Sequence, residues 1–112
     1  MEVKDLKVSI APQEVLELVW QQVSNAISAQ FLDQYILETE QGVVVMGLFE
    51  KYYMRSGNRA TLTVLATDFD GVTHVHLAAG GGGQGAIFRF DWGAGGNFVE
   101  LAANALGQYV LE

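Results

Sequence analysis

The chain contains no cysteine among its 112 residues, and it has only one proline. The lack of cysteine excludes disulfide bonds, thiol nucleophiles and cysteine ligands for a metal. No apolar run reaches the roughly 18 residues that a transmembrane helix requires. The N-terminal residues Met1 to Asp5 lack the basic and then apolar pattern of a signal peptide. These absences predict a cytoplasmic protein that has no membrane partner.

Basic residues are also scarce, because six lysine and arginine residues stand against 13 acidic ones and leave a net charge of −7. Binding to nucleic acid depends on a basic footprint that neutralises phosphates, so this balance disfavours nucleic acid as a partner. Half of the residues are hydrophobic, which is ample for one core in a chain of this length. We therefore predict a single domain that spans residues 1–112.

The apolar pattern predicts two helices and a series of strands. Pro12 suits the first turn of a helix, which we expect over residues 12–29, either continuous or broken near Ser24. Apolar residues at helical spacing predict a final helix from Phe98 to Val110. Alternating, β-branched and aromatic runs predict the strands. These strands are expected at residues 3–10, 31–40, 43–55, 59–67, 72–79 and 86–92.

Short turns separate most of the expected strands, and short connections imply antiparallel hairpins. We therefore predict an α+β fold with a single antiparallel sheet of five to six strands. An N-terminal helix and a long C-terminal helix are expected to pack on one face of that sheet. Gly47 lies inside a strand and is a candidate site for a β-bulge.

Eight of the 13 glycines fall between Gly80 and Gly96. The formal match to G-x-G-x-x-G in residues 80–85 precedes a strand-like segment, whereas the dinucleotide motif requires a helix there. We interpret the run as a structural connection. The alternative is a backbone anion site formed by Gly82, Gly83 and Gly85.

Asn97 follows the second glycine cluster and stands before the expected final helix. Its spacing to Glu100 matches a capping box, so we predict that Asn97 is the N-cap. The N-terminus of a helix can also hold an anion. We favour a plain cap, because no lysine, serine or threonine follows to complete a phosphate site.

His74 and His76 project from the same face of a strand, because side chains alternate along it. A His-x-His pair can begin a metal site but needs a third ligand, for which Asp91 is the favoured in-phase carboxylate. We therefore expect no metal and no cofactor. The segment from Asp68 to Gly71 resembles the start of a calcium loop but lacks the glutamate at position twelve, so we interpret it as a turn.

Alternation also predicts which residues face the helices. The expected helix-facing sets are Leu62, Val64 and Ala66; Val75, Leu77 and Ala79; Phe88, Phe90 and Trp92; and Val44, Met46 and Leu48. The opposite phase carries both histidines and four of the six basic residues. That set is Lys51, Tyr53, Arg55, Arg59, Thr61, Thr63, His74, His76, Arg89 and Asp91.

Two interpretations of this polar face remain open. It is either the solvated side of the sheet or a cationic platform for a small anionic ligand, an acidic partner or a second subunit. Arg89 is the favoured anchor, because arginine grips a carboxylate or phosphate bidentately. The candidate ligand-binding residues are Arg59, His74, His76, Arg89, Asp91, Gly82, Gly83 and Gly85.

Four segments of the C-terminal half carry a family resemblance. They are Arg59-Ala-Thr-Leu-Thr-Val, His74-Val-His, Gly81-Gly-Gly-Gln-Gly and Phe88-Arg-Phe-Asp-Trp-Gly-Ala-Gly. They resemble a small family of uncharacterised bacterial proteins, mainly from Gram-positive species, and this resemblance implies no particular activity. The element order is similar to the helix-grip (START-like) fold, whose sheet wraps a long C-terminal helix around an apolar ligand cavity.

Three functions follow as expectations. The first is a non-catalytic module that binds a small ligand, with an anion as one candidate. The second is a homo-oligomeric structural or adaptor protein, because a short chain rich in apolar and aromatic residues favours a buried interface. The third is a metal-dependent enzyme that uses the two histidines. An enzyme is the less favoured of these expectations, because the sequence has no Gly-x-Ser-x-Gly nucleophile motif.

Overall fold

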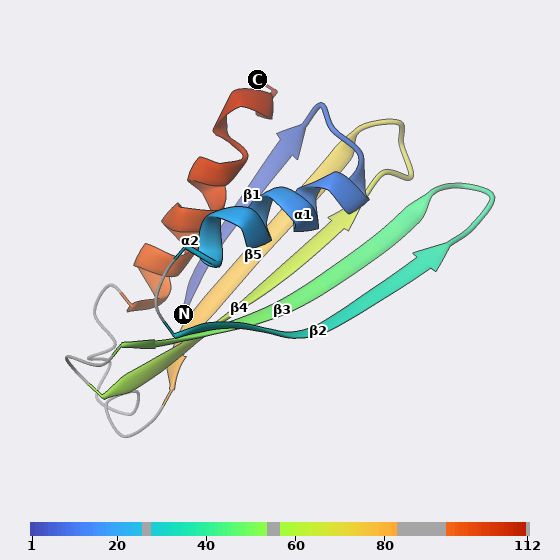
Figure 1. Cartoon of the computed structure of the whole chain (residues 1–112). Coiled ribbons are helices and arrows are strands. Elements are labelled where there is room, and N and C mark those ends of the chain that lie inside the picture. The colour runs from blue at the N-terminus through green and yellow to red at the C-terminus, as the bar shows by residue number, and fades with distance from the viewer. Residues whose placement is uncertain (26–27, 54–56, 83–93, 112) are drawn as a thin grey trace.

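A computed structural model describes residues 1–25, 28–53, 57–82 and 94–111 of the chain (Figure 1). The sheet consists of five strands, and two helices and a final 3-10 turn complete the described elements. In chain order these are β1 (Glu2–Val8), α1 (Pro12–Val23), β2 (Ala29–Glu38), β3 (Val43–Tyr53), β4 (Asn58–Thr67), β5 (Thr73–Gly82), α2 (Ala94–Ala105) and the 3-10 turn Gly107–Tyr109. The predicted α+β class is confirmed.

The five strands form one antiparallel sheet in the order β1-β5-β4-β3-β2. Both helices lie on the same side of this sheet (Figure 1), as predicted. We call that side the helix face and the other side the open face, because no described element covers it. The sixth expected strand, residues 86–92, lies outside the described residues.

The core forms between the helices and the strands β4 and β5. Leu62, Val64 and Ala66 of β4 are fully buried, and Val75, Leu77 and Ala79 of β5 are buried beside them. The predicted phase of these two strands is therefore confirmed. Phe88, Phe90 and Trp92 lie outside the described residues.

Strand β3 has the opposite phase to the one predicted. Its buried helix-facing residues are Val45, Gly47 and Phe49, while the partly exposed Val44, Met46 and Leu48 lie on the open face. Lys51 pairs with the buried Ala60 in the ladder, so it belongs to the helix face, and Tyr53 has the same strand phase. Arg55 lies outside the described residues. The prediction failed because both phases of this strand are apolar.

Gly47 explains why the odd phase is the buried one. A Cβ atom at this glycine would lie 2.5 Å from Cδ2 of Leu16 on α1, so the helix packs directly onto the glycine backbone. The β3–β4 pairing runs through Gly47 without a break, so the predicted bulge is not there. The irregular register lies instead in β2, between Phe31 and Asp33.

Helix α1 begins at Pro12, as predicted, and ends at Val23. The predicted end at Ala29 was wrong, because Ala29 is the first residue of β2. The Glu14 carboxylate accepts a hydrogen bond of 3.0 Å from the backbone amide of Ala11. This contact satisfies one of the free backbone groups at the helix start. On the buried side, the Trp20 ring stacks on Phe49 with centroids 6.0 Å apart and ties α1 to β3.

Helix α2 differs from the prediction at both ends. It begins at Ala94, so Asn97 lies one turn inside the helix, and its assignment as N-cap was wrong. It spans 12 residues and ends at Ala105, so the long C-terminal helix of the predicted fold and of the helix-grip resemblance is not confirmed. The buried stripe of the final segment is Phe98, Val99, Ala102, Ala103 and Leu106.

The last described residues return to the sheet instead of continuing the helix. Val110 forms a bridge with Val8 of β1, and the amide of Leu111 donates a hydrogen bond of 2.7 Å to the carbonyl of Lys7. The amide of Ser9 donates to the carbonyl of Tyr109 at 2.9 Å. These bonds occupy the outer edge of β1, which explains why the predicted helix over residues 98–110 stops early.

Strand β5 continues into the glycine run. Gly80 to Gly82 pair with Thr61, Ala60 and Arg59 of β4, so the first part of the predicted connection is a strand. The remainder of the glycine-rich stretch, residues 83–93, lies outside the described residues. Within the described helices, none has the length and apolar character needed to cross a membrane.

Candidate ligand-binding groove

The predicted site residues are divided between two ends of the sheet. Arg59, His74 and His76 all project from the open face, as their phase predicted. However, Arg59 pairs with Gly82, whereas His74 pairs with Thr67 at the other end of β4. At about 3.3 Å per residue, Arg59 and His74 are about 26 Å apart along the strand. Arg89, Asp91, Gly83 and Gly85 lie outside the described residues.

Each of these three basic side chains has a carboxylate beside it. Arg59 Nη1 lies 3.8 Å from Glu50 Oε2, His74 Nε2 lies 2.8 Å from Asp70 Oδ2, and His76 Nδ1 lies 2.6 Å from Asp5 Oδ1. The described part of the open face therefore carries charges of both signs. It does not form the uniformly cationic platform that the sequence suggested.

Six side chains from three strands gather at one end of the open face. Residues directly opposite each other on antiparallel strands have Cβ atoms about 4.5–5.5 Å apart and share a face. The pairing of β1 with β5 and of β5 with β4 places these six residues in two rows across the strands. The rows are Lys7–His74–Thr67 and Asp5–His76–Leu65.

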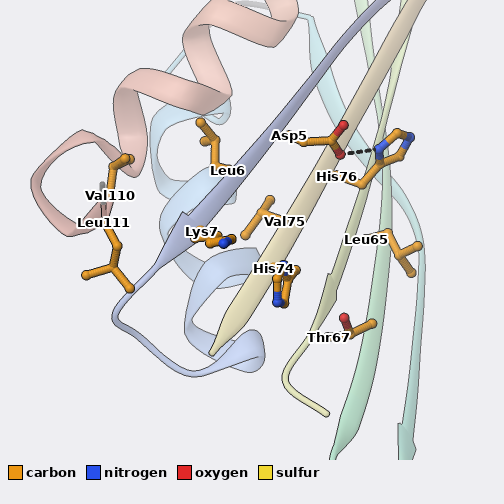
Figure 2. A pocket seen from close by; sticks show the side chains of 10 residues that line it. All are labelled: Asp5, Leu6, Lys7, Leu65, Thr67, His74, Val75, His76, Val110 and Leu111. Atoms are coloured by element: carbon orange, nitrogen blue, oxygen red, sulfur yellow. Dashed lines mark hydrogen bonds and ion pairs between the residues drawn. The ribbon is translucent and has the colours of Figure 1, made fainter. Parts of the chain in front are cut away.

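These two rows line a groove of about 430 Å³ (Figure 2). The remaining lining residues are Leu6, Val75, Val110 and Leu111. Leu111 is present because the C-terminal segment pairs with the outer edge of β1. The groove therefore combines apolar side chains with a compact polar group.

The Asp5–His76 pair fixes one imidazole in the groove (Figure 2). An ionised carboxylate only accepts hydrogen bonds, so Nδ1–H of His76 is the donor in this 2.6 Å contact. The second ring nitrogen, Nε2, is then left for a hydrogen bond with another group. Both side chains remain substantially exposed, at 45% and 74%, so solvent or a ligand can reach them.

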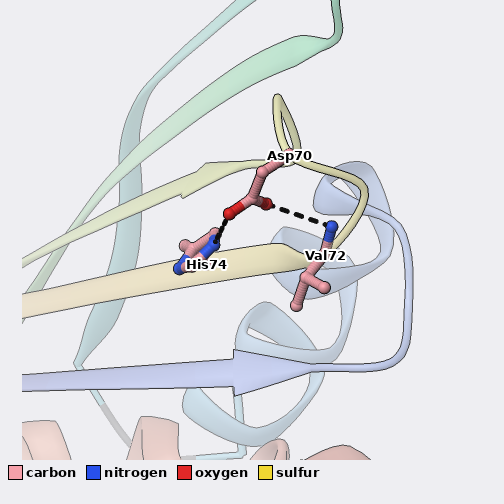
Figure 3. Close-up of polar contacts among 3 residues, drawn as sticks. All are labelled: Asp70, Val72 and His74. Carbon is pink, nitrogen blue, oxygen red and sulfur yellow. Dashed lines mark hydrogen bonds and ion pairs between the residues drawn. The ribbon is translucent and has the colours of Figure 1, made fainter.

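The Asp70–His74 pair joins the turn between β4 and β5 to the beginning of β5 (Figure 3). Asp70 accepts a hydrogen bond from His74 Nε2 at 2.8 Å and another from the amide of Val72 at 3.2 Å. The hydrogen bond from His74, and to a smaller extent the one from the Val72 amide, lowers the pKa of the Asp70 carboxyl from its ordinary value. Asp70 therefore stays ionised near neutral pH and holds the His74 ring in one orientation.

Lys7 is the basic residue of the groove that has no ion pair with another described residue. It shares a row with His74 and Thr67, so an ammonium, an imidazole and a hydroxyl lie next to one another. Together with Leu65 and Leu111, this set can bind a molecule that has one polar end and an apolar body.

The arrangement gives no support to a metal centre in the described part of the chain. No three histidine, aspartate or glutamate side chains gather there closely enough to hold a metal ion. Each histidine instead contacts a carboxylate of its own.

Sequence reasoning missed Asp5, Lys7, Leu65, Thr67 and Leu111. Asp5 and Lys7 alternate along β1, which is a visible signal that they share a face. What the sequence does not show is that β1 pairs with β5, about 70 positions further along the chain. Asp70 was interpreted as a turn residue only, although it precedes His74 by four positions.

The fold and the groove define a class of protein, a two-layer α+β protein with both helices on one face of the sheet. No described element covers the other face, and a partly polar groove lies at one end of it. The chain matches the model of DUF6054, a family of unknown function, over residues 1–110. It therefore belongs to this family. No curated protein and no solved structure matches the chain.

Proposed function

We propose that this protein is a non-catalytic module that binds a small amphipathic molecule with one anionic group. The observation that carries the proposal is the position of Lys7. It lies opposite His74 in a groove that Leu65 and Leu111 also line. The volume of about 430 Å³ is within the range of small-molecule sites, about 300–1,000 Å³.

The polar groups of the groove suit a single carboxylate. The ammonium of Lys7 provides a charge-assisted hydrogen bond, which is stronger than a neutral one. Thr67 can donate from its hydroxyl, and Leu65 and Leu111 offer apolar surface to the rest of the ligand. Asp5 and Asp70 add negative charge around the histidines, so a ligand with several negative charges is disfavoured and a monoanion is preferred.

Thermal melting with chemically matched probes tests this proposal. Octanoate supplies a carboxylate and an apolar chain, octylamine reverses the charge, and acetate lacks the chain. A ligand present at about tenfold its dissociation constant stabilises the folded state by about 1.4 kcal/mol. In a domain of this size that corresponds to a rise in Tm of about 4–8 °C. We expect this rise with octanoate and neither with octylamine nor with acetate.

Two lysine variants assign the effect to the groove. Lys7→Ala should remove most of the octanoate shift, because the ammonium partner is lost. Lys4→Ala is the matched control, because Lys4 is on the same strand but on the helix face, 3.7 Å from Glu100. The proposal is wrong if Lys7→Ala keeps the full shift, or if octylamine stabilises the protein as much as octanoate does.

A further inference from the structure

A second feature of the open face lies next to the groove, on strands β3 and β4. Three cross-strand pairs form a patch that carries no charge and is partly exposed to solvent. The pairs are Val44–Thr67, Met46–Leu65 and Leu48–Thr63, and we call them the central patch. On the neighbouring strand β2, Leu37 pairs with Val44 and Tyr35 pairs with Met46. Leu37 and Tyr35 are 45% and 55% exposed and extend the apolar surface to the sheet edge.

This composition is unusual for the uncovered side of a sheet. Antiparallel sheets that face water on one side generally carry polar residues there. Contiguous exposed apolar surface marks interaction sites, and protein interfaces have a centre depleted of charge within a polar rim. The charged residues toward the rim of the open face include Asp5, Lys7, Asp33, Glu50 and Arg59. His74 and His76 lie between the β1 residues and the central patch. The open face therefore has the composition of an interface.

We propose that the open face is covered by the open face of a second copy of this chain, so that two sheets pack against each other in a homodimer. Five strands spaced about 4.8 Å apart and about ten residues long give a footprint of about 800 Å². A stable protein interface buries about 800 Å² on each partner. The area of the face therefore matches what a dimer needs.

The chemistry of the central patch favours a second copy as the occupant. In a twofold interface the same surface meets itself, so a charged centre would place like charges opposite each other. The central patch avoids this conflict, because its six residues are apolar or threonine. The rim contains both acidic and basic side chains, which can pair across the dimer.

The sheet edges are less suited to self-association. The end of the outer edge of β1, at Lys7 and Val8, is occupied by the C-terminal residues Tyr109 to Leu111. The outer edge of β2 is interrupted between Phe31 and Asp33, and bulges at an edge hinder pairing with another strand. Association through the face is thus favoured over extension of the sheet.

The dimer goes beyond the proposed function, but its interface shares residues with the proposed ligand groove. Leu65 belongs both to the central patch and to the groove lining. A partner sheet packed on the open face therefore also covers the groove, because both of its residue rows lie on that face. The two proposals still have separate tests, because the mass of the protein is measured without any ligand.

Light scattering coupled to size-exclusion chromatography tests the dimer, with circular dichroism to confirm that each variant is folded. We expect the parent chain to have twice the mass of the 12.2 kDa monomer. Met46→Glu and, independently, Leu48→Glu should return the mass to one chain, because each places a charge at the centre of the interface. Lys4→Ala, on the helix face beside Glu100, should leave the mass unchanged.

Ile36→Glu is the matched control. Ile36 is 41% exposed and is the neighbour of Tyr35 and Leu37, but it pairs with the buried Val45 and so faces the helix side. This variant should remain dimeric. A parent chain that is monomeric at all concentrations overturns the proposal. So does a dimer that survives both folded central-patch variants, or one that is lost with Ile36→Glu but not with Met46→Glu.

Discussion

Gly47 shows how a single residue decides which side of a strand receives a helix. A side chain at this position would meet Leu16 at 2.5 Å and the Phe49 ring at 3.3 Å. Leu16 and Phe49 are themselves buried, so neither can move aside freely in a close-packed core. The glycine thus allows α1 to approach β3, and the close packing fixes the phase of the strand.

We expect Gly47→Ala to lower the free energy of unfolding by about 1–3 kcal/mol, the usual cost of overpacking a core. Urea denaturation measures this change. Leu16→Ala should remove most of the penalty in the double variant, because the missing methyl groups leave room for the new one. Such coupling is expected between residues in contact.

Gly80→Ala is the control for Gly47→Ala. Gly80 is also in a strand, but its added Cβ would meet only Met1 Cε, at an ordinary contact distance of 3.5 Å. Replacing a strand glycine by alanine otherwise stabilises by about 0.5–1 kcal/mol. If the two variants had equal stabilities, the packing role of Gly47 would be excluded.

At the residue scale, the site was only partly predictable. The orientation of His74 and His76 followed from their spacing, but their carboxylate partners did not. Asp5 reaches His76 through the pairing of β1 with β5, and a local pattern carries no information on a partner 71 positions away. Asp70 reaches His74 through the geometry of a turn. The predicted anchor Arg89 stays untested, because it lies outside the described residues.

At the scale of elements, strands with strict alternation were predictable and strands with two apolar faces were not. In β4 the polar residues Thr61 and Thr63 alternate with the buried Leu62 and Val64, so only one phase fits a core. In β3 both phases are apolar. The open-face residues of β3 are therefore as apolar in the sequence as the buried ones. An apolar pattern on both faces of a strand is consistent with a second face that is covered by a partner.

Helix α2 shows a second limit of periodicity. Leu106, Tyr109 and Val110 continue the helical spacing of the preceding residues, yet the helix ends at Ala105. Hydrogen bonds with β1 hold Tyr109 and Leu111, and Val110 forms its bridge with Val8. Tertiary pairing of this kind overrides a local pattern, and single-chain spacing cannot anticipate it.

Leu106 is the residue through which the end of α2 is docked to the core, because it is fully buried. We expect Leu106→Asp to lower the free energy of unfolding by about 3 kcal/mol or more, since apolar contacts are lost and an unpaired charge is buried. Asn104→Asp adds the same charge at an exposed position of this helix and should have little effect. Equal denaturation midpoints for the two variants would contradict the described docking.

At the scale of the whole molecule, the chain has apolar residues on both sides of its sheet but helices on only one side. The helix face is closed by α1 and α2, whose buried residues form one cluster with β3, β4 and β5. The open face has no such cover among the described elements, although its centre is uncharged. A net charge of −7 limits non-specific association, and the second copy proposed above is the specific partner that would cover this surface.

The homodimer predicts that stability depends on chain concentration. If the folded dimer unfolds to two separate chains, mass action raises Tm as concentration rises. A tenfold increase adds about 1.4 kcal/mol per dimer, which corresponds to about 2–4 °C for an assembly of this size. Scanning calorimetry across a range of concentrations should show this rise for the parent chain and for Ile36→Glu. Met46→Glu should melt at a constant temperature, because a monomer unfolds independently of concentration. A constant Tm for the parent would contradict the proposed homodimer, because its unfolding would then be independent of chain concentration.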